Sequence, residues 1–186
     1  MNLNYNISIK DPQPEFVSLQ HAKNHLKIDF IYEDALIQGM IDSAIDTAEN
    51  YLGWFIKNRD VVINSNAFLN YFALEFGPLL GSAFTVKYLN KNNVLQTLIE
   101  GYTYQEFYGA KPVFYYDSDI PFPEVGKKSN TVQISYVAGV DLTTIPKPVY
   151  QAILLIISDL YEFRTDRAEI INTRAMALMR PYKKFT

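Results

Sequence analysis

The sequence predicts an α+β fold in which a small helical bundle, with two helices near each end of the chain, carries an inserted and mostly antiparallel β unit. Apolar residues recur at helical spacing on both sides of the middle of the chain. The middle itself consists of short runs rich in β-branched and aromatic residues, separated by turn residues. Of the 186 residues, 48% are apolar, which is enough to build a core and excludes a disordered chain.

We expect one folded unit with the following parts. They are an N-terminal arm at 1–15, a helical core at 16–57 and 145–181, a β-rich insertion at 58–140, and a C-terminal tail at 182–186. The arm is predicted to be extended, because Pro12 and Pro14 disfavour a helix. It also lacks an apolar stretch of the kind that marks a signal peptide.

Two helices are predicted after the arm. Ser18 is the expected N-cap of a short helix over 19–27. A second helix is predicted over 33–52, because its apolar residues cover about half of the helix circumference. Gly53 can adopt the left-handed conformation that ends such a helix.

The β unit is predicted from seven short runs. They lie at 60–64, 71–75, 84–89, 94–98, 104–107, 113–116 and 132–137. The tetrapeptide Asn90-Lys91-Asn92-Asn93 favours a hairpin turn between two of these strands.

Two more helices are predicted near the C-terminus. The first covers 147–163 with Pro148 in its first turn, where a missing N–H costs nothing. Its apolar run Ala152–Ile157 indicates burial on nearly all sides, and the helix is too short to cross a membrane. The second covers 167–179 and is stopped by Pro181.

Few residue types that support catalysis are present. The chain has no cysteine and two histidines, which excludes thiolate metal sites, disulfides and a cysteine nucleophile. His21 and His25 are one helical turn apart, but the glutamate of a helical zinc motif is missing, so we expect surface histidines. No phosphate-binding loop or nucleophile elbow occurs either. We therefore expect no catalytic residue, no metal and no cofactor.

Charge is spread unevenly along the chain. Residues 1–53 carry three lysines against eight acids, a net of −5, and residues 164–186 carry six basic residues against two acids, a net of +4. We expect these surfaces to meet at an interface, with ordinary surface variation as the alternative. The candidate interface residues are Asp42, Asp46 and Glu49 on the polar face of the second helix, and Arg167, Arg174, Arg180, Tyr182, Lys183 and Lys184 in the C-terminal segment.

A series of short motifs extends over residues 16–183. They include Val17-Ser18-Leu19-x-x-Ala22-Lys23-x-x-Leu26-Lys27-Ile28-Asp29, Glu33-Asp34-Ala35-Leu36-Ile37, Ala48-Glu49-x-Tyr51-Leu52-Gly53, Gly77-Pro78-Leu79, Val86-Lys87-Tyr88-Leu89, Val132-x-Ile134-x-Tyr136-Val137-Ala138-Gly139, Gln151-Ala152-Ile153-Leu154-Leu155, Tyr161-Glu162-x-Arg164 and Ala177-Leu178-Met179-Arg180-Pro181-Tyr182. In order and spacing this series resembles the head–tail connector, or adaptor, family of tailed bacteriophages and prophages, in its longer type with a β insertion.

The resemblance implies a structural role without an enzymatic reaction. Family members form a ring of about a dozen copies beneath the portal after DNA packaging, a closed arrangement of heterologous interfaces. The ring extends the DNA channel and joins the head to a stopper or tail-completion protein. DNA passes through it without sequence-specific binding, and no membrane is involved. The resemblance also implies a location in the virion neck after synthesis in the bacterial host cytoplasm, and docking of residues 180–186 on the portal.

Other functions remain open at this point. The chain could be another neck protein, such as a stopper or tail-completion protein, although those are mostly β-structured. It could be an unrelated soluble enzyme with a sparse site in a cleft. It could also be a DNA-binding module that uses only its basic C-terminal tail, in which case its binding would depend on salt.

Overall fold

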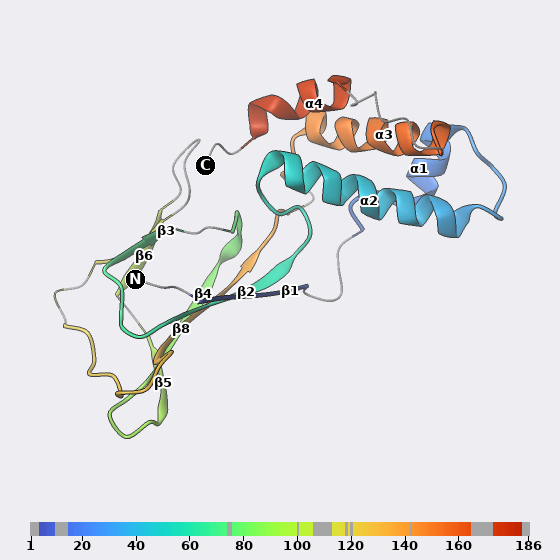
Figure 1. Cartoon of the computed structure of the whole chain (residues 1–186). Coiled ribbons are helices and arrows are strands. Elements are labelled where there is room, and N and C mark those ends of the chain that lie inside the picture. The colour runs from blue at the N-terminus through green and yellow to red at the C-terminus, as the bar shows by residue number, and fades with distance from the viewer. Residues whose placement is uncertain are drawn as a thin grey trace. The chain divides into compact units, whose positions relative to one another are not determined.

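The structure is a computed structural model of the chain, and it describes residues 4–9, 15–73, 76–99, 101–105, 113–117, 119, 121–141, 143–164 and 173–183. The chain divides into two compact units. We call them the sheet unit, formed by 1–13 and 57–140, and the helical unit, formed by 14–56 and 141–186. The predicted α+β fold, with four helices and an antiparallel β-rich insertion, is confirmed (Figure 1).

A five-stranded antiparallel sheet organises the sheet unit. Its strands are β1 (Asn4–Ile9), β2 (Arg59–Ser65), β8 (Val132–Ala138), β4 (Leu79–Leu89) and β5 (Leu95–Leu98), in that spatial order. Along β8 and most of β2 every second side chain is buried, as expected for strands with one face on a core. Ile63 and Ile134 lie opposite each other in register, and both are buried.

Strand β1 comes from the predicted N-terminal arm. It pairs antiparallel with β2, so that Asn4 lies opposite Asn64 and Ile9 lies opposite Arg59. The ring of Tyr5 packs edge-on against Phe76, with 5.3 Å between the ring centres. The extended conformation that the prolines predicted is therefore that of an edge strand in the sheet.

Strand β4 begins earlier than predicted, at Leu79 instead of residue 84. The register of β4 against β8 shifts between Leu79 and Phe84, and Gly81 within this stretch has a φ of 73°. A bulge of this kind breaks the alternation of side chains, which explains why the sequence pattern showed only the second half of the strand.

A second, three-stranded sheet packs on the first through aromatic rings. Its strands are β3 (Tyr71–Ala73), β7 (Val113–Tyr116) and β6 (Tyr102–Gln105), in that spatial order. The buried ring of Phe114 lies 5.0 Å from the ring of Phe72 and 4.3 Å from that of Phe84 on β4. The Tyr102 hydroxyl donates to the Leu69 carbonyl at 2.6 Å, and burial raises the pKa of Tyr102 to about 12.

The first two helices of the helical unit have the predicted caps. Helix α1 (Leu19–Leu26) begins after Ser18, whose Oγ accepts the His21 N–H at 3.1 Å, and it ends before Lys27, whose φ is 59°. Helix α2 (Asp34–Leu52) ends at Gly53, which has a φ of 73°. The buried side chains of α2 form one stripe. They are Ile37, Ile41, Ala44, Ile45, Ala48, Glu49 and Leu52.

The C-terminal helices complete this core. Helix α3 (Lys147–Glu162) lies beside α2, and α4 (Thr173–Met179) packs on α3 (Figure 1). Five of the six side chains in the apolar run of α3 are buried, which confirms the predicted burial. Pro181 lies in a 3₁₀ turn, η1 (Arg180–Tyr182), directly after α4. The first residues of the predicted last helix, up to 172, lie outside the described residues.

Candidate interface surfaces

Two of the three predicted acidic residues lie on the surface of α2. Asp42 and Asp46 are exposed, one helical turn apart, on the side of the helix away from its buried stripe. Like charges at this spacing weaken an isolated helix slightly, so other contacts must hold the helix in place. The buried stripe of α2, packed against α3, supplies them.

Glu49 was predicted to lie on the acidic face of α2, and this is wrong, because its side chain is buried and only 7% exposed. Its carboxylate accepts the backbone N–H of Ile56 at 2.7 Å and thereby fixes the turn that follows α2. A signal for this position was present in the sequence. Glu49 is one helical turn from the buried Ile45, which places it about 40° away from Ile45 around the helix, at the flank of the apolar stripe.

The basic C-terminal segment is described only in part. Arg174 on α4 and Arg180 on η1 are exposed. Lys183 is exposed as well, and its Nζ lies 4.9 Å from the centre of the Tyr51 ring at the end of α2, a cation–π arrangement. Arg167 and Lys184 lie outside the described residues.

Trp54 anchors this segment to the end of α2. Its Nε1–H donates to the carbonyl oxygen of Tyr182 at 2.9 Å, across 128 residues of sequence. Trp54 is 9% exposed and Tyr182 is half-buried, so this hydrogen bond is largely shielded from water. The structure therefore presents Arg180 and Lys183 from a fixed position next to the C-terminal end of α2.

Glu33, Tyr161 and Arg164 connect the two halves of the helical unit. The sequence pattern did not group them together. Glu33 accepts the Tyr161 hydroxyl proton at 2.6 Å and an Arg164 N–H at 2.9 Å, and the Arg164 guanidinium lies over the Tyr161 ring. The hydrogen bond from Tyr161 is the main cause that lowers the pKa of Glu33, and Arg164 lowers it further. The same hydrogen bond raises the pKa of Tyr161.

An exposed apolar patch lies just before α2 and in its first turn. Its members Ile31 and Tyr32 are 79% and 78% exposed, and Leu36 is 44% exposed. The ring of Tyr32 stacks on that of Phe30, with 4.2 Å between the centres and an interplanar angle of 7°. The sequence pattern predicted only a break between two helices at this position. The run Phe30-Ile31-Tyr32 was the signal for the patch, because consecutive apolar residues outside the predicted helices often mark an interaction surface.

The family resemblance is confirmed for the first helical segment. The family model described as "Phage gp6-like head-tail connector protein" matches residues 16–69, which include α1 and α2. No curated protein sequence matches the chain.

Solved structures of gene transfer agent (GTA) particles share the fold of the entire chain. The neck of an empty GTA particle computed with C6 symmetry contains a chain of 18% identity with a TM-score of 0.74. The virion of a native GTA particle contains a chain of 17% identity with a TM-score of 0.72. The neck of a native GTA particle computed with C12 symmetry contains a chain of 18% identity with a TM-score of 0.70. Each comparison covers 100% of this chain and 97% of the other.

The described part of the chain contains neither a cluster of metal-ligating side chains nor a membrane-spanning helix. No group of three or more carboxylate or histidine side chains there is arranged to hold a metal ion. No helix among these residues is both long and apolar enough to span a lipid bilayer.

Proposed function

We propose that this chain is a head–tail connector of a phage-like particle, located in the neck. The observation that carries the proposal is the coincidence of two likenesses. The connector family model matches the α1–α2 region, and the chain has, over its full length, the fold of a protein in GTA necks. The first likeness comes from sequence and the second from structure.

The proposed connector acts as a ring of copies below the portal, where it extends the DNA channel and receives a stopper or tail-completion protein. The similar chains come from necks computed with C6 and C12 symmetry, which is the kind of arrangement that a ring requires. A cyclic ring needs two different complementary surfaces on each copy. The helical unit offers several candidates: the exposed acids Asp42 and Asp46, the apolar patch, and the basic segment that Trp54 anchors.

We assign no chemical reaction to the chain. A neck connector works by binding, and the surfaces described above are suited to binding. The proposed role therefore depends on shape, charge and apolar contact at interfaces.

The test is a mass measurement by light scattering on the purified chain, alone and mixed with the portal protein of the same particle. We expect a complex with the portal that contains about a dozen copies of the chain, since a closed ring has a fixed copy number. A monomer in the absence of portal is compatible with the proposal. Failure to associate with the assembled portal would overturn it.

A further inference from the structure

Two loops of the sheet unit are held side by side at the end of the β4–β5 hairpin. One is the hairpin turn itself, and the other is the segment that leads toward β8. Asn90 and Val125 form an isolated antiparallel bridge, and the Gly126 N–H donates to the Leu89 carbonyl at 2.9 Å. A Cβ atom at Gly126 would lie only 3.0 Å from the Asn90 carbonyl oxygen, so a glycine permits this close approach.

The hairpin turn is itself fixed by its own side chains. The Asn90 side-chain oxygen accepts the backbone N–H groups of Asn92 and Val94, at 2.9 and 3.0 Å. Asn93 has a φ of 57°, a left-handed conformation that asparagine tolerates well. Side chains that leave this turn therefore start from a defined backbone.

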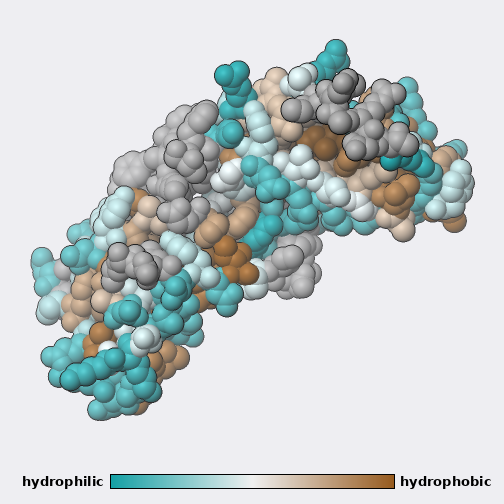
Figure 2. All heavy atoms as spheres, viewed as in Figure 1, coloured by the Kyte–Doolittle hydropathy of each residue, from teal (hydrophilic) through white to brown (hydrophobic). Residues whose placement is uncertain are grey.

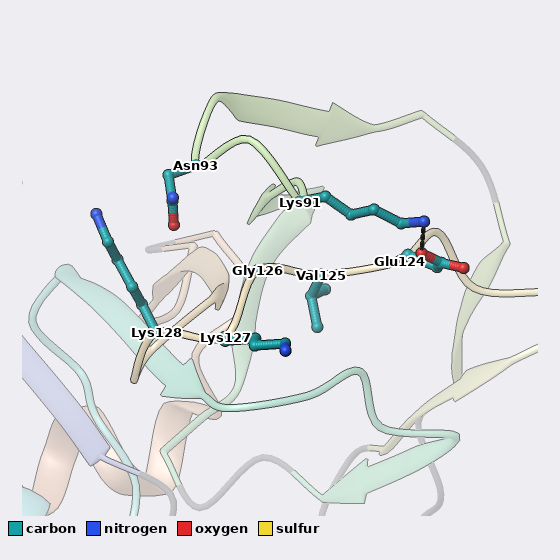
Figure 3. A pocket seen from close by; sticks show the side chains of 7 residues that line it. All are labelled: Lys91, Asn93, Glu124, Val125, Gly126, Lys127 and Lys128. Atoms are coloured by element: carbon teal, nitrogen blue, oxygen red, sulfur yellow. Dashed lines mark ion pairs between the residues drawn. The ribbon is translucent and has the colours of Figure 1, made fainter.

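The two loops enclose an open cavity of about 610 Å³ (Figure 3), which we call the lysine pocket. Its lining residues are Lys91, Asn93, Glu124, Val125, Gly126, Lys127 and Lys128. The lining thus includes three lysine side chains and one carboxylate. Lys91 extends toward Glu124 and forms an ion pair with it (Figure 3). For Lys127 and Lys128, both exposed, the structure gives no ion-pair partner among the residues that it describes.

The chemistry of this lining favours phosphate groups over a protein surface. Protein interfaces are depleted in lysine and enriched in aromatic residues, whereas Val125 is the one apolar side chain among the seven described lining residues. Figure 2 shows a mainly hydrophilic surface over the region of the hairpin. Lysine binds phosphate as a flexible point charge, and asparagine amides also donate to phosphate oxygens.

We propose that the lysine pocket binds the phosphodiester backbone of duplex DNA without reading its sequence. The choice of duplex DNA among polyanions rests on the proposed neck function. The chain as a whole has a formal charge of −3, so a general attraction cannot bring it to DNA and a local basic site is required. Such a contact would guide DNA weakly as it passes, because phosphate contacts carry no sequence information.

The test measures the anisotropy of a labelled duplex of mixed sequence with the full chain, at salt concentrations from 50 to 200 mM. The double variant Lys127→Gln, Lys128→Gln should bind about tenfold more weakly at the lowest salt. Its slope of log affinity against log salt should be shallower by about 2. The variant Glu124→Gln should bind more tightly than the wild type, because it removes the one acid and releases Lys91.

The matched control is Lys27→Gln, Lys147→Gln, which removes two exposed lysines from the helical unit. It should retain wild-type affinity and slope. An equal loss in the control, an unchanged affinity in the lysine-pocket variant, or no binding by the wild type at 50 mM salt would each overturn the inference. A polyglutamate peptide serves as a competing partner. If the variant Lys127→Gln, Lys128→Gln loses binding to the peptide but keeps its affinity for DNA, the pocket binds an acidic protein instead.

The outcome can be separated from that of the proposed function. If the lysine-pocket variant loses DNA affinity but still assembles with the portal, both proposals hold. If the wild type assembles with the portal but does not bind DNA, only the inference fails. If DNA binding depends on Lys127 and Lys128 but the portal is not bound, the pocket remains and the connector role is overturned.

Discussion

At the scale of single residues, Glu49 holds the turn after α2, because its buried carboxylate accepts the Ile56 N–H. The change Glu49→Ala should lower the free energy of unfolding by about 1–3 kcal/mol, since it leaves a buried N–H without an acceptor. Urea unfolding followed by the fluorescence of Trp54, the single tryptophan of the chain, measures this loss. Glu49→Gln keeps an oxygen acceptor and should cost less.

The control for this prediction is a pair of exposed residues on the same helix. Gln38→Ala and Asn50→Ala should each change the free energy of unfolding by no more than about 0.5 kcal/mol, as is usual for surface positions. Equal effects at Glu49 and at these two positions would show that the Glu49 carboxylate does not support the turn.

Glu33 predicts a pH dependence of stability. Its pKa in the folded chain is lowered from 4.5 by the Tyr161 hydrogen bond and by Arg164. A carboxylate with a lowered folded pKa contributes stability that is present above its unfolded pKa and is lost as the pH falls through the folded value. The urea midpoint of the wild type should therefore exceed that of Glu33→Gln at pH 7, and the difference should shrink below pH 4.5.

The comparison with Asp42→Asn separates this effect from general acid unfolding. That variant removes an exposed carboxylate of α2 and should follow the wild-type pH profile closely. A difference between wild type and Glu33→Gln that stays constant between pH 7 and pH 3 would contradict the role of the Glu33 carboxylate.

At the scale of elements, local signals in the sequence were sufficient where the cause of a structure is local. Ser18 and Gly53 cap their helices as predicted, because a cap depends on the residue itself and on the adjacent helix. The positions that were missed depend on distant partners. Tyr161 in the last turn of α3 and Arg164 just after the helix are three residues apart, but nothing in the sequence assigns Glu33 to them. The place of Glu49 at the flank of the apolar stripe could be read from the sequence, but its hydrogen-bond partner, the Ile56 N–H, depends on the turn after α2.

Strand β1 also depends on a distant partner, because its residues pair with β2 50 to 60 residues further along the chain. Deletion of residues 1–9 leaves β2 as an edge strand with unpaired backbone groups. In hydrogen-exchange mass spectrometry, peptides from β2 should lose protection, and the protein should associate more strongly as its concentration rises. Peptides from α2 are the internal control and should keep their protection. Unchanged exchange in β2 would mean that β1 does not stabilise this edge.

At the scale of the whole molecule, the formal charge of −3 conceals an acidic start, with a net of −5 over residues 1–53, and a basic end, with a net of +4 over residues 164–186. The structure keeps Asp42 and Asp46 exposed on α2 and presents Arg180 and Lys183 beside Trp54. Because Glu49 is buried, the acidic face of α2 consists of two exposed carboxylates, those of Asp42 and Asp46, which are the candidates to contact a basic partner. The prediction that these surfaces meet across copies or on the portal can therefore be reduced to two residues on each side.

The double charge reversal Arg180→Glu, Lys183→Glu should weaken assembly with the portal roughly tenfold or more, because like charges would then face each other across the interface. Lys27→Glu, Lys147→Glu makes the same change in charge at exposed positions of the helical unit and should assemble normally. Adding Asp42→Lys, Asp46→Lys to the first variant should restore assembly if the two surfaces meet between neighbouring copies. Weak assembly without restoration would place the basic residues against the portal, and undiminished assembly of the first variant would reject both contacts.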